Sequence, residues 1–276
     1  MMSRIYPKGY ILKVNTLKQI LGREWEISPA GGATGEAFIA IHEKEKLFLK
    51  RNSSPFLAVL SAEGIVPKLV WTKRLENGDV ITAQKWLSGR VLRPEEMNQE
   101  RVAKLLHKIH TSAPLLNMLK KMGKSPVKPE GWLKKIEERL DEEIYSLPVV
   151  TSSLQFLRRE AENVWTDLQV VCHCDVNHNN WLLGENGQLY LIDWDEAMIG
   201  DPAIDLGMLL HWYIPRNEWD DWIRLYGAEL TPQLLLRMKW YVIALTLNSI
   251  QWHMDLDRLA EMDKQIRFLE ENLHRS

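Results

Sequence analysis

A hairpin signal in the second half of the chain constrains its fold more than any other feature. Two short apolar segments, 181–183 and 188–192, are joined by a polar turn that contains an Asn-Gly pair. An Asn-Gly pair between apolar segments strongly favours a two-stranded hairpin. Because a hairpin brings its outer ends together, Asn180 and Asp193 are expected to be neighbours in space although they are 13 positions apart.

A third polar residue, Asp175, precedes this hairpin and completes a set that suits phosphoryl transfer. Transfer from ATP needs an acceptor hydroxyl held in line and a divalent cation on the phosphate oxygens. Asp175 could accept the hydroxyl proton or orient the hydroxyl, whereas Asn180 and Asp193 offer the oxygen ligands that Mg²⁺ prefers. Each residue alone is common in turns and caps, but their agreement in type and spacing favours the functional interpretation.

The surrounding motif resembles a known superfamily. His173 and Asp175 are followed after five residues by Asn180, and the run 193–206 reads Asp-Trp-Asp-Glu-Ala-Met-Ile-Gly-Asp-Pro-Ala-Ile-Asp-Leu. This pattern resembles the aminoglycoside phosphotransferase and choline kinase superfamily, which has the protein-kinase-like fold. Over residues 175–181 the chain is also similar to a narrower group, the Firmicute CcrZ/YtmP subfamily of cell-cycle regulators with sugar kinase activity.

The resemblance implies an α+β, bilobal protein-kinase-like fold. A small β-rich N-lobe over residues 1–87 would bind the nucleotide, and a larger, mainly helical C-lobe over residues 88–276 would carry the catalytic residues and bind the acceptor. ATP and Mg²⁺ are the implied cofactors. Asp205 would accept backbone N–H bonds from the catalytic loop, while His173 and Asp195 would play supporting roles without transferring the proton.

The resemblance further implies a small-molecule hydroxyl acceptor, a pentose such as ribose or 2-deoxyribose, and a role in the control of DNA replication initiation. Replication-initiation or cell-division proteins would then be partners. Aminoglycoside, choline and thiamine kinases are alternatives, because the five tryptophans after position 209 and the carboxylates among them suit a cationic amine as well as a sugar. A regulatory binding protein on a kinase-like fold is the alternative outside enzymes.

One residue departs from the superfamily pattern. Members usually have Gly between the His and the catalytic Asp, whereas this chain has Cys174. Gly permits a backbone conformation that Cys reaches only at a cost. We do not interpret Cys174 as a nucleophile, because phosphoryl transfer needs none. Together with Cys172 it is more simply explained as a small buried thiol.

A glycine-rich segment in the N-terminal part is a candidate phosphate-binding loop. Its residues are Gly31, Gly32, Ala33, Thr34 and Gly35. Glycines allow backbone N–H groups to approach phosphate oxygens closely, although such clusters are often plain hairpin turns. A strand-like segment follows at the spacing expected of a kinase-like fold and contains Lys50, which would then contact the α and β phosphates.

Two further assignments complete the expected nucleotide site. Glu63 is the only acidic residue between positions 51 and 75, which makes it the candidate ion-pair partner of Lys50. Because Gly64 follows directly, Glu63 could instead mark the end of a helix. The second assignment is the segment Ala83, Gln84, Lys85 and Trp86. By analogy with kinase-like folds its backbone would meet the adenine edge, and an ordinary core strand is the alternative.

Beyond position 90 apolar residues recur at helical spacing. His107 and His110 lie in the first such helix. Two histidines three positions apart can bind a metal, but packing explains them more simply. The Lys-rich segment 118–135 is interpreted as a solvated loop, and no direct binding of nucleic acid is expected because it contains a single aromatic residue, Trp132.

Length and composition fit a cytoplasmic enzyme. The 276 residues suffice for one large or two small domains. The two cysteines, separated by one residue, argue against a disulfide framework. No apolar stretch approaches the roughly 20 residues of a membrane helix, and the N-terminus lacks the apolar block of a signal peptide. The net charge of −2 combines a basic first half with an acidic second half, which would suit ATP and Mg²⁺ respectively.

Overall fold

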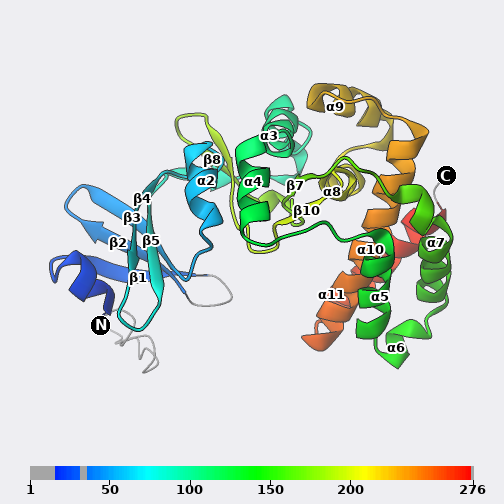
Figure 1. Cartoon of the computed structure of the whole chain (residues 1–276), viewed down its shortest axis with the longest axis horizontal. Helices are drawn as coiled ribbons and strands as arrows, with labels where there is room; N and C mark the ends of the chain where they lie inside the picture. The colour runs from blue at the N-terminus through cyan, green and yellow to red at the C-terminus, as the bar shows by residue number, and fades with distance from the viewer. Residues whose placement is uncertain (1–15, 32–35, 275–276) are drawn as a thin grey trace. The chain divides into compact units, whose positions relative to one another are not determined.

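The computed structural model describes residues 16–31 and 36–274, which form two compact units. The first unit comprises residues up to Arg90 together with Leu183–Tyr190, and the second comprises Val91–Leu182 and Leu191–Ser276 (Figure 1). The sequence placed the boundary after residue 87. The division by contacts places it three residues later and adds the tip of a hairpin from the second half of the chain to the first unit.

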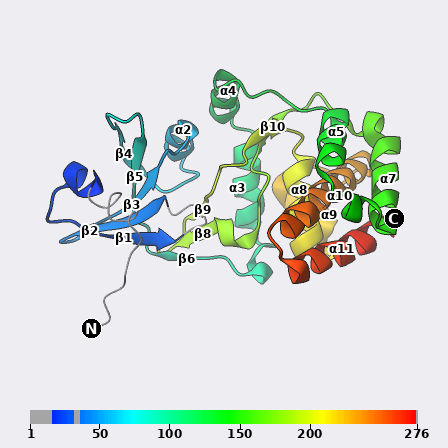
Figure 2. The ribbon, with the colours of Figure 1, turned by 90° about the horizontal axis from the view of Figure 1, so that it is seen from below.

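An antiparallel five-stranded sheet forms the centre of the first unit, with strand order β1-β2-β3-β5-β4 (Figure 2). The strands are β1 (Glu26–Gly31), β2 (Ala37–His42), β3 (Glu45–Arg51), β4 (Leu69–Arg74) and β5 (Val80–Lys85). Alternate residues of a strand point to opposite faces of the sheet. Leu47 and Leu49 of β3 therefore enter the buried core of this unit, beside Phe38 and Trp25. Lys50 lies on the opposite face.

Two helical segments accompany this sheet. Residues 16–21 form a short helix whose Leu17 joins the same core as β3. Helix α2 (Phe56–Ala62) buries Phe56 and Leu60. Its Ser61 hydroxyl accepts the N–H of Leu69 at 2.7 Å, which ties the helix to the start of β4.

The predicted hairpin is present as strands β8 (Trp181–Gly184) and β9 (Leu189–Leu191), which form a three-stranded sheet with β6 (Gly89–Val91). The Gly184 N–H donates to the Gln188 carbonyl at 2.9 Å and closes the turn. Gly187 has φ +79°, a left-handed conformation that Gly adopts without steric cost. The Asn-Gly signal in the sequence therefore identified both the turn and the residue that makes it.

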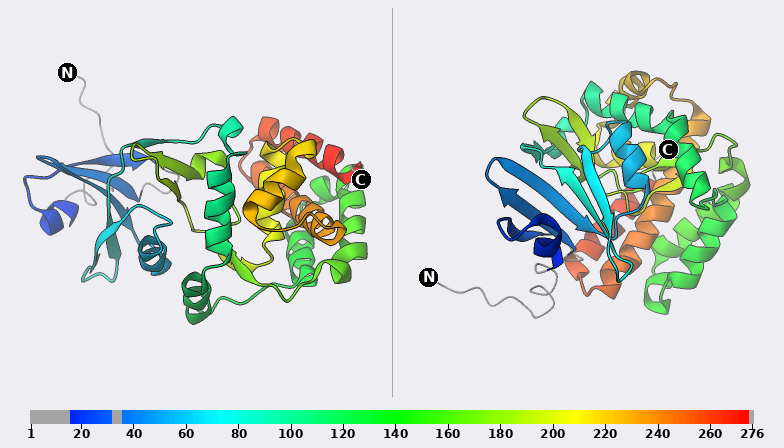
Figure 3. Two further views of the ribbon diagram at one scale, coloured as in Figure 1. Left: turned by 90° about the horizontal axis from the view of Figure 1, so that it is seen from above. Right: turned by 60° about the vertical axis from the view of Figure 1, so that its left-hand side comes forward.

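The second unit is mainly helical. Its elements are η1 (Pro94–Glu96), α3 (Glu100–His110), α4 (Ala113–Lys121), α5 (Pro129–Arg139), α6 (Glu142–Tyr145), α7 (Pro148–Val164), β7 (Val170–Cys172), η2 (His178–Asn180), β10 (Met198–Gly200), α8 (Ala203–Tyr213), η3 (Arg216–Glu218), α9 (Trp219–Tyr226), α10 (Pro232–Asp255) and α11 (Leu259–His274). Helix α10 packs against α5, α7, α8 and α11. Helices α10 and α11 are the orange and red ribbons in Figure 3.

Helix α8 begins directly after an Asp-Pro pair. Pro202 precedes the first helical residue, and the Asp201 carboxylate accepts the Ala203 N–H at 2.9 Å. Asp201 therefore satisfies one of the free N–H groups at the start of the helix. Burial raises the pKa of Asp201, although the guanidinium of Arg237, 3.3 Å from the carboxylate, acts in the opposite direction.

The predicted α+β class is confirmed: an antiparallel sheet in the N-terminal part is followed by a mainly helical region. Over residues 16–31 and 36–274, no helix combines the length and the apolar character needed to span a membrane.

Candidate active site

Asp175 lies in the loop between β7 and η2, and two asparagine side chains hold its carboxylate. The amide of Asn177 donates to Oδ1 at 2.6 Å, and the amide of Asn180 donates to Oδ2 at 2.8 Å. The same Asn180 amide nitrogen also donates to the Asp175 carbonyl at 2.9 Å. Asp175 therefore has a fixed rotamer, and each carboxylate oxygen keeps further lone pairs for another donor.

Asn180 is 9% exposed, and its side-chain orientation follows from these bonds. Both groups opposite its Nδ2 are oxygens, so the amide nitrogen must face Asp175. The Oδ1 atom then points to the other side of the amide. An amide oxygen in that position has the chemistry of a ligand for a hard cation such as Mg²⁺.

Asp193 follows β9 and is positioned by the residues on either side of it. The Ile192 N–H donates to the Asn180 carbonyl at 2.9 Å, which confirms the expected proximity of these two chain segments. On the other side, the Trp194 indole N–H donates to the Leu191 carbonyl at 2.7 Å. Asp193 itself is exposed and has φ +67°. The backbone of Asp193 therefore lies beside that of Asn180, in a left-handed conformation that is strained for a residue other than Gly.

His173 connects the chain segment at Asp175 with the chain segment at Asp193. Its Nδ1 accepts the N–H of Asp175 at 3.2 Å, so the ring proton lies on Nε2, which donates to the Ile192 carbonyl at 2.9 Å. The Trp194 ring packs edge-on against the imidazole, with ring centres 4.7 Å apart. His173 is fully buried. It therefore joins the backbone of Asp175 to the backbone next to Asp193, which is a structural role.

Asp205 is fully buried in the first turn of α8, and its carboxylate contacts the backbone of the loop that carries Asp175. Its carboxylate accepts the N–H of His173 at 2.7 Å and that of Cys174 at 2.8 Å. Burial alone would raise the pKa of Asp205, but the hydrogen bonds from the His110 side chain and from the His173 N–H leave the pKa below its usual value. Asp195 is exposed in the turn before β10.

Cys174 has φ +67°, the left-handed conformation in which a side chain is strained. The expectation that this position favours Gly therefore has a direct geometric basis. Burial raises the pKa of the Cys174 thiol well above its usual value, and the nearby carboxylates of Asp205, Glu196 and Asp175 raise it further. The thiol is consequently protonated at neutral pH and is not a nucleophile.

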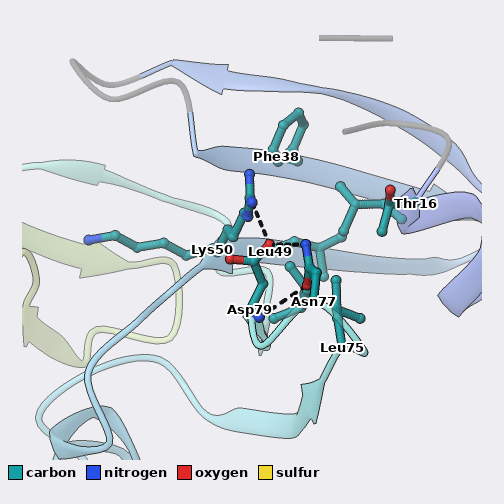
Figure 4. Close-up of a pocket in the computed structure, with 10 residues that line it drawn as sticks. Thr16, Phe38, Leu49, Lys50, Leu75, Asn77 and Asp79 are labelled. Carbon is teal, nitrogen blue, oxygen red and sulfur yellow. Dashed lines mark hydrogen bonds and ion pairs between the residues drawn. The ribbon is translucent and has the colours of Figure 1, made fainter. Parts of the chain in front are cut away.

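The first unit carries the residues expected to bind phosphate. Lys50 lies near the end of β3 and borders a cavity of about 190 Å³. Its side chain extends away from those of Asp79 and Asn77, which also line this cavity (Figure 4). Gly31 ends β1. The other four residues of the predicted phosphate loop, positions 32–35, lie outside the described residues.

The remaining nucleotide-site candidates lie at the ends of α2 and β5. Glu63 is the C-cap of α2, so it occupies a helix end, and its pairing with Lys50 stays a prediction. At the end of β5, the Lys85 N–H donates to the Lys68 carbonyl at 2.8 Å and the Trp86 N–H to the Lys46 carbonyl at 3.0 Å. These two donors are therefore already used inside the sheet.

The remaining two members of the predicted adenine segment lie within β5. Ala83 is fully buried, and Gln84, 8% exposed, donates from its side chain to the Pro67 carbonyl at 2.8 Å. Both are packed as in a core strand. The contact of this segment with adenine stays a prediction.

Sequence reasoning missed two residues of this site. Asn177 holds Asp175, and Tyr213 at the end of α8 accepts the N–H of His178 at 3.1 Å. The Tyr213 hydroxyl also lies 3.2 Å from Nδ1 of His178. Asn177 could have been identified from the sequence, because it lies only two residues after Asp175. Tyr213 is 35 positions from His178 and left no local signal.

Comparisons with known proteins identify the family and the fold of the chain. The model of the phosphotransferase enzyme family matches residues 27–241. The choline kinase LicA from Streptococcus pneumoniae aligns over 95% of this chain and 99% of its own, with a TM-score of 0.67 and 19% identity, and it has also been solved with AMP. A putative aminoglycoside phosphotransferase from Ralstonia eutropha aligns over 95% and 97%, with a TM-score of 0.71 and 14% identity.

A spectinomycin phosphotransferase solved with ADP and spectinomycin aligns over 93% of each chain, with a TM-score of 0.61 and 17% identity. At these identities the solved structures establish the shared fold. The family match covers most of the sequence and includes Asp175, Asn180, Asp193 and Asp205. The chain belongs to the phosphotransferase enzyme family.

Proposed function

We propose that the protein is a kinase that transfers the γ-phosphoryl group of ATP to a hydroxyl of a small molecule, with Mg²⁺ as the metal. The observation that carries this proposal is the catalytic loop, in which two amides fix the carboxylate of Asp175 and the hairpin holds Asp193 next to Asn180. Transfer of a phosphoryl group depends mainly on positioning and on electrostatic stabilisation. A carboxylate held in one rotamer meets the first requirement.

Asp175 is the catalytic residue of this proposal. Its oxygens each accept one amide N–H and retain lone pairs for the acceptor hydroxyl. The carboxylate aims that hydroxyl at the phosphorus and takes its proton as the new O–P bond forms. The bond between the γ-phosphorus and the β,γ-bridging oxygen breaks, and ADP leaves with the electron pair. His173 and Asp205 hold the loop and take no proton.

Asn180 and Asp193 would hold the metal, since the amide oxygen of one and the carboxylate of the other are hard oxygen donors. When bound, Mg²⁺ neutralises charge on the phosphate oxygens. The buried Asn180 has no rotational freedom, because its nitrogen is committed to Asp175. Its oxygen therefore serves the cation at no further cost in side-chain entropy.

On the nucleotide side, the proposal assigns the phosphates to Lys50 and to the glycine-rich segment 31–35. Glu63 would orient Lys50. The adenine would meet the backbone around Ala83, Gln84, Lys85 and Trp86. Because the N–H groups of Lys85 and Trp86 are engaged within the sheet, the Leu87 N–H is the next donor along the chain, and we assign it to the base.

For the acceptor, we propose a pentose such as ribose or 2-deoxyribose, within the control of replication initiation. The sequence likeness of residues 175–181 to the CcrZ/YtmP group supports this choice. The polar groups around Asp175 include the amide of Asn177, the imidazole of His178 and the phenol of Tyr213. Such groups can exchange hydrogen bonds with the hydroxyls of a sugar.

A screen of acceptors tests the proposal. ADP formation would be measured with ATP and Mg²⁺ across ribose, 2-deoxyribose, other sugars, choline, thiamine, spectinomycin and other aminoglycosides. We expect pentose-dependent turnover in the wild type and a loss of about 10²- to 10⁴-fold in kcat for Asp175→Asn. Asn180→Ala and Asp193→Ala should also lose rate, and part of that loss should be recovered at higher Mg²⁺.

The matched control is Glu185→Gln, which changes an exposed carboxylate in the turn between β8 and β9 and should retain most of the rate. Turnover with choline or an aminoglycoside alone would reject the pentose but retain the kinase. If no acceptor gave turnover in a folded protein, the kinase would be rejected in favour of a regulatory binding protein. An Asp175→Asn strain that kept full cell-cycle function would likewise assign the cellular role to docking.

A further inference from the structure

A buried histidine of α3 reaches the carboxylate that supports the catalytic loop. His110 is 6% exposed, and its Nε2 lies 3.1 Å from Oδ2 of Asp205. The two residues are 95 positions apart in the chain. Oδ2 of Asp205 is the same oxygen that accepts the N–H of His173 at 2.7 Å. One carboxylate oxygen therefore receives a donor from α3 and a donor from the catalytic loop.

The chemistry of this cluster is that of hydrogen bonds. Ligating atoms of His110, Cys172 and Asp205 lie within 4.8 Å of one another, a spacing that a metal ion would accept. Both ring nitrogens of His110 and both oxygens of Asp205 already have partners, and the Cys172 thiol donates to the Asp201 carbonyl at 3.2 Å. Burial raises the pKa of that thiol well above its usual value. The cluster is therefore a hydrogen-bonded core.

The tautomer of His110 follows from its two partners. Asp205 accepts the backbone N–H of His173 through Oδ2 and has a lowered pKa, so it is an acceptor and the Nε2 of His110 carries a proton. The other nitrogen, Nδ1, lies 2.8 Å from the Tyr226 hydroxyl. Burial raises the pKa of Tyr226, so the phenol keeps its proton and donates it to Nδ1. Tyr226 thus selects the tautomer that serves Asp205.

Helix α9 holds Tyr226 in this position. Its ring stacks with Trp222 at 6.4 Å and meets the ring of His110 edge-on at 5.7 Å. Tyr226 is 8% exposed, and Trp222 is 2% exposed. The chain of contacts therefore runs from α9 through His110 to Asp205, and from there to the backbone of the loop that carries Asp175. Every side chain in it is buried.

We propose that His110 is a positioning residue for phosphoryl transfer: with Tyr226 behind it, it fixes the charge and orientation of Asp205 and thereby the conformation of the catalytic loop. The loop needs this support because Cys174 sits at φ +67° and its N–H is held by Oδ1 of Asp205. If the carboxylate rotates or takes up a proton, the strained residue is released and Asp175 moves with it. This inference rests on the proposed function for its kinetic consequence.

The pH profile separates this role from simple packing. The titratable groups around Asp205 are His110 on α3, Tyr226 on α9, and Cys172, His173 and Cys174 on β7 and the loop after it. The folded-state pKa of Asp205 lies below its ordinary value, so its support is present at neutral pH and is lost as pH falls through that pKa. Removing the His110 donor raises this pKa, so activity should be lost at a higher pH.

The test compares His110→Met with His110→Gln, because Gln keeps a donor near the position of Nε2 and Met does not. Kinetics with the acceptor that the wild type uses would be combined with backbone hydrogen exchange of the segment 170–176. We expect His110→Met to lower kcat by about 10- to 100-fold, as for other groups that orient a reacting residue, with the KM for ATP changed less than about twofold. Backbone hydrogen exchange at 170–176 should be faster than in the wild type. The acid limb of the pH–rate profile should move to higher pH.

Two further variants keep the experiment decisive. His107→Met changes a histidine on the same helix that touches the Tyr226 ring, with centres 5.4 Å apart, and it should behave as the wild type. If His110→Met fails to fold, Tyr226→Phe tests the same series of contacts with a smaller change. We expect a smaller loss of kcat and, again, faster backbone hydrogen exchange at 170–176. Restoration of kcat and of slow exchange by His110→Gln supports the proposal.

The contrary result is also defined. A folded His110→Met protein with wild-type kcat and wild-type exchange at 170–176 overturns the positioning role, and so does a His110→Gln protein as impaired as His110→Met. If the wild type itself shows no turnover, the proposed function fails, while the exchange measurement still decides whether His110 holds the loop.

Discussion

At the scale of single residues, two positions with strained backbone lie in the candidate active site. Cys174 and Asp193 both have φ +67°, and neither is Gly. Such conformations persist only where the surroundings hold them. Asp205 holds the first through the Cys174 N–H, and the bonds of Ile192 hold the chain next to the second. The two strained positions are therefore at or next to the residues to which we assign proton transfer and metal binding.

A pair of substitutions at Cys174 should measure this strain. Gly and Ala both remove the thiol, but only Gly is unstrained at φ +67°. We expect Cys174→Gly to be more stable than Cys174→Ala by about 1 kcal/mol, since a left-handed conformation costs an L-residue roughly that amount. Both should retain activity, because the thiol takes no part in catalysis. Denaturant unfolding gives the comparison, and equal stabilities would contradict the account of strain.

At the scale of elements, the β8–β9 hairpin fixes the spacing of Asn180 and Asp193, and a glycine makes its turn. Gly187 has φ +79°, and an added Cβ would meet no atom within 4 Å. Gly187→Ala should therefore cost about 1 kcal/mol through backbone conformation alone. Because the hairpin sets the separation of the two proposed metal ligands, we expect the concentration of Mg²⁺ needed for half-maximal rate to rise.

The chain provides a matched control for this experiment. Gly78 in the turn between β4 and β5 has φ +90° and also has no atom within 4 Å of an added Cβ. Gly78→Ala should lose similar stability and leave the Mg²⁺ requirement unchanged. If both variants needed more Mg²⁺ to the same extent, general destabilisation rather than the hairpin would explain the higher Mg²⁺ requirement.

Helices α8 and α10 are joined by a buried ion pair, Asp201 with Arg237, whose side chains are 1% and 16% exposed. Arg237→Met leaves the carboxylate buried without its partner, which should lower the free energy of unfolding at pH 7 by about 3 kcal/mol. The pKa of Asp201 is already raised by burial and should rise further. The folded variant then binds this proton more tightly than the unfolded chain does, so the deficit should shrink as pH falls.

Unfolding at pH 7 and pH 5 checks the sign of this effect. The double variant Arg237→Met with Asp201→Asn removes the charge while retaining an acceptor for the Ala203 N–H, and it should recover much of the loss. If the loss in free energy of unfolding were larger at pH 5 than at pH 7, a carboxylate other than Asp201 would dominate the pH dependence.

The elements show why part of the site could be predicted and part could not. The hairpin, the cap of α8 and the trio of polar residues are encoded within short stretches, so local turn and strand rules identify them. The link between His110 and Asp205 joins positions 95 apart, and only packing of α3 against α9 and β7 creates it. The sequence therefore predicted a packed histidine and missed its partner.

At the scale of the whole molecule, the proposed chemistry is divided between the two units. Asp175, Asn180, Asp193 and Asp205 belong to the second unit, whereas Lys50 belongs to the first. Each unit has its own sheet or helical core, so a substitution at a ligand-binding position of one unit need not unfold the other. The proposal thus assigns contacts with nucleotide and Mg²⁺ to residues of each unit, and substitutions in each unit test these assignments separately.

Thermal unfolding with nucleotide tests this division. A ligand at about 100 times its Kd stabilises the folded state by roughly 2.7 kcal/mol, which is several degrees in Tm for a chain of this size. We expect ATP with Mg²⁺ to raise Tm, and Asp193→Ala to lose the part that depends on Mg²⁺. Lys50→Met should lose most of the response even with Mg²⁺. Lys73→Met, on the exposed side of β4, should respond as the wild type does, and if it lost as much as Lys50→Met the response would reflect general charge rather than a phosphate contact.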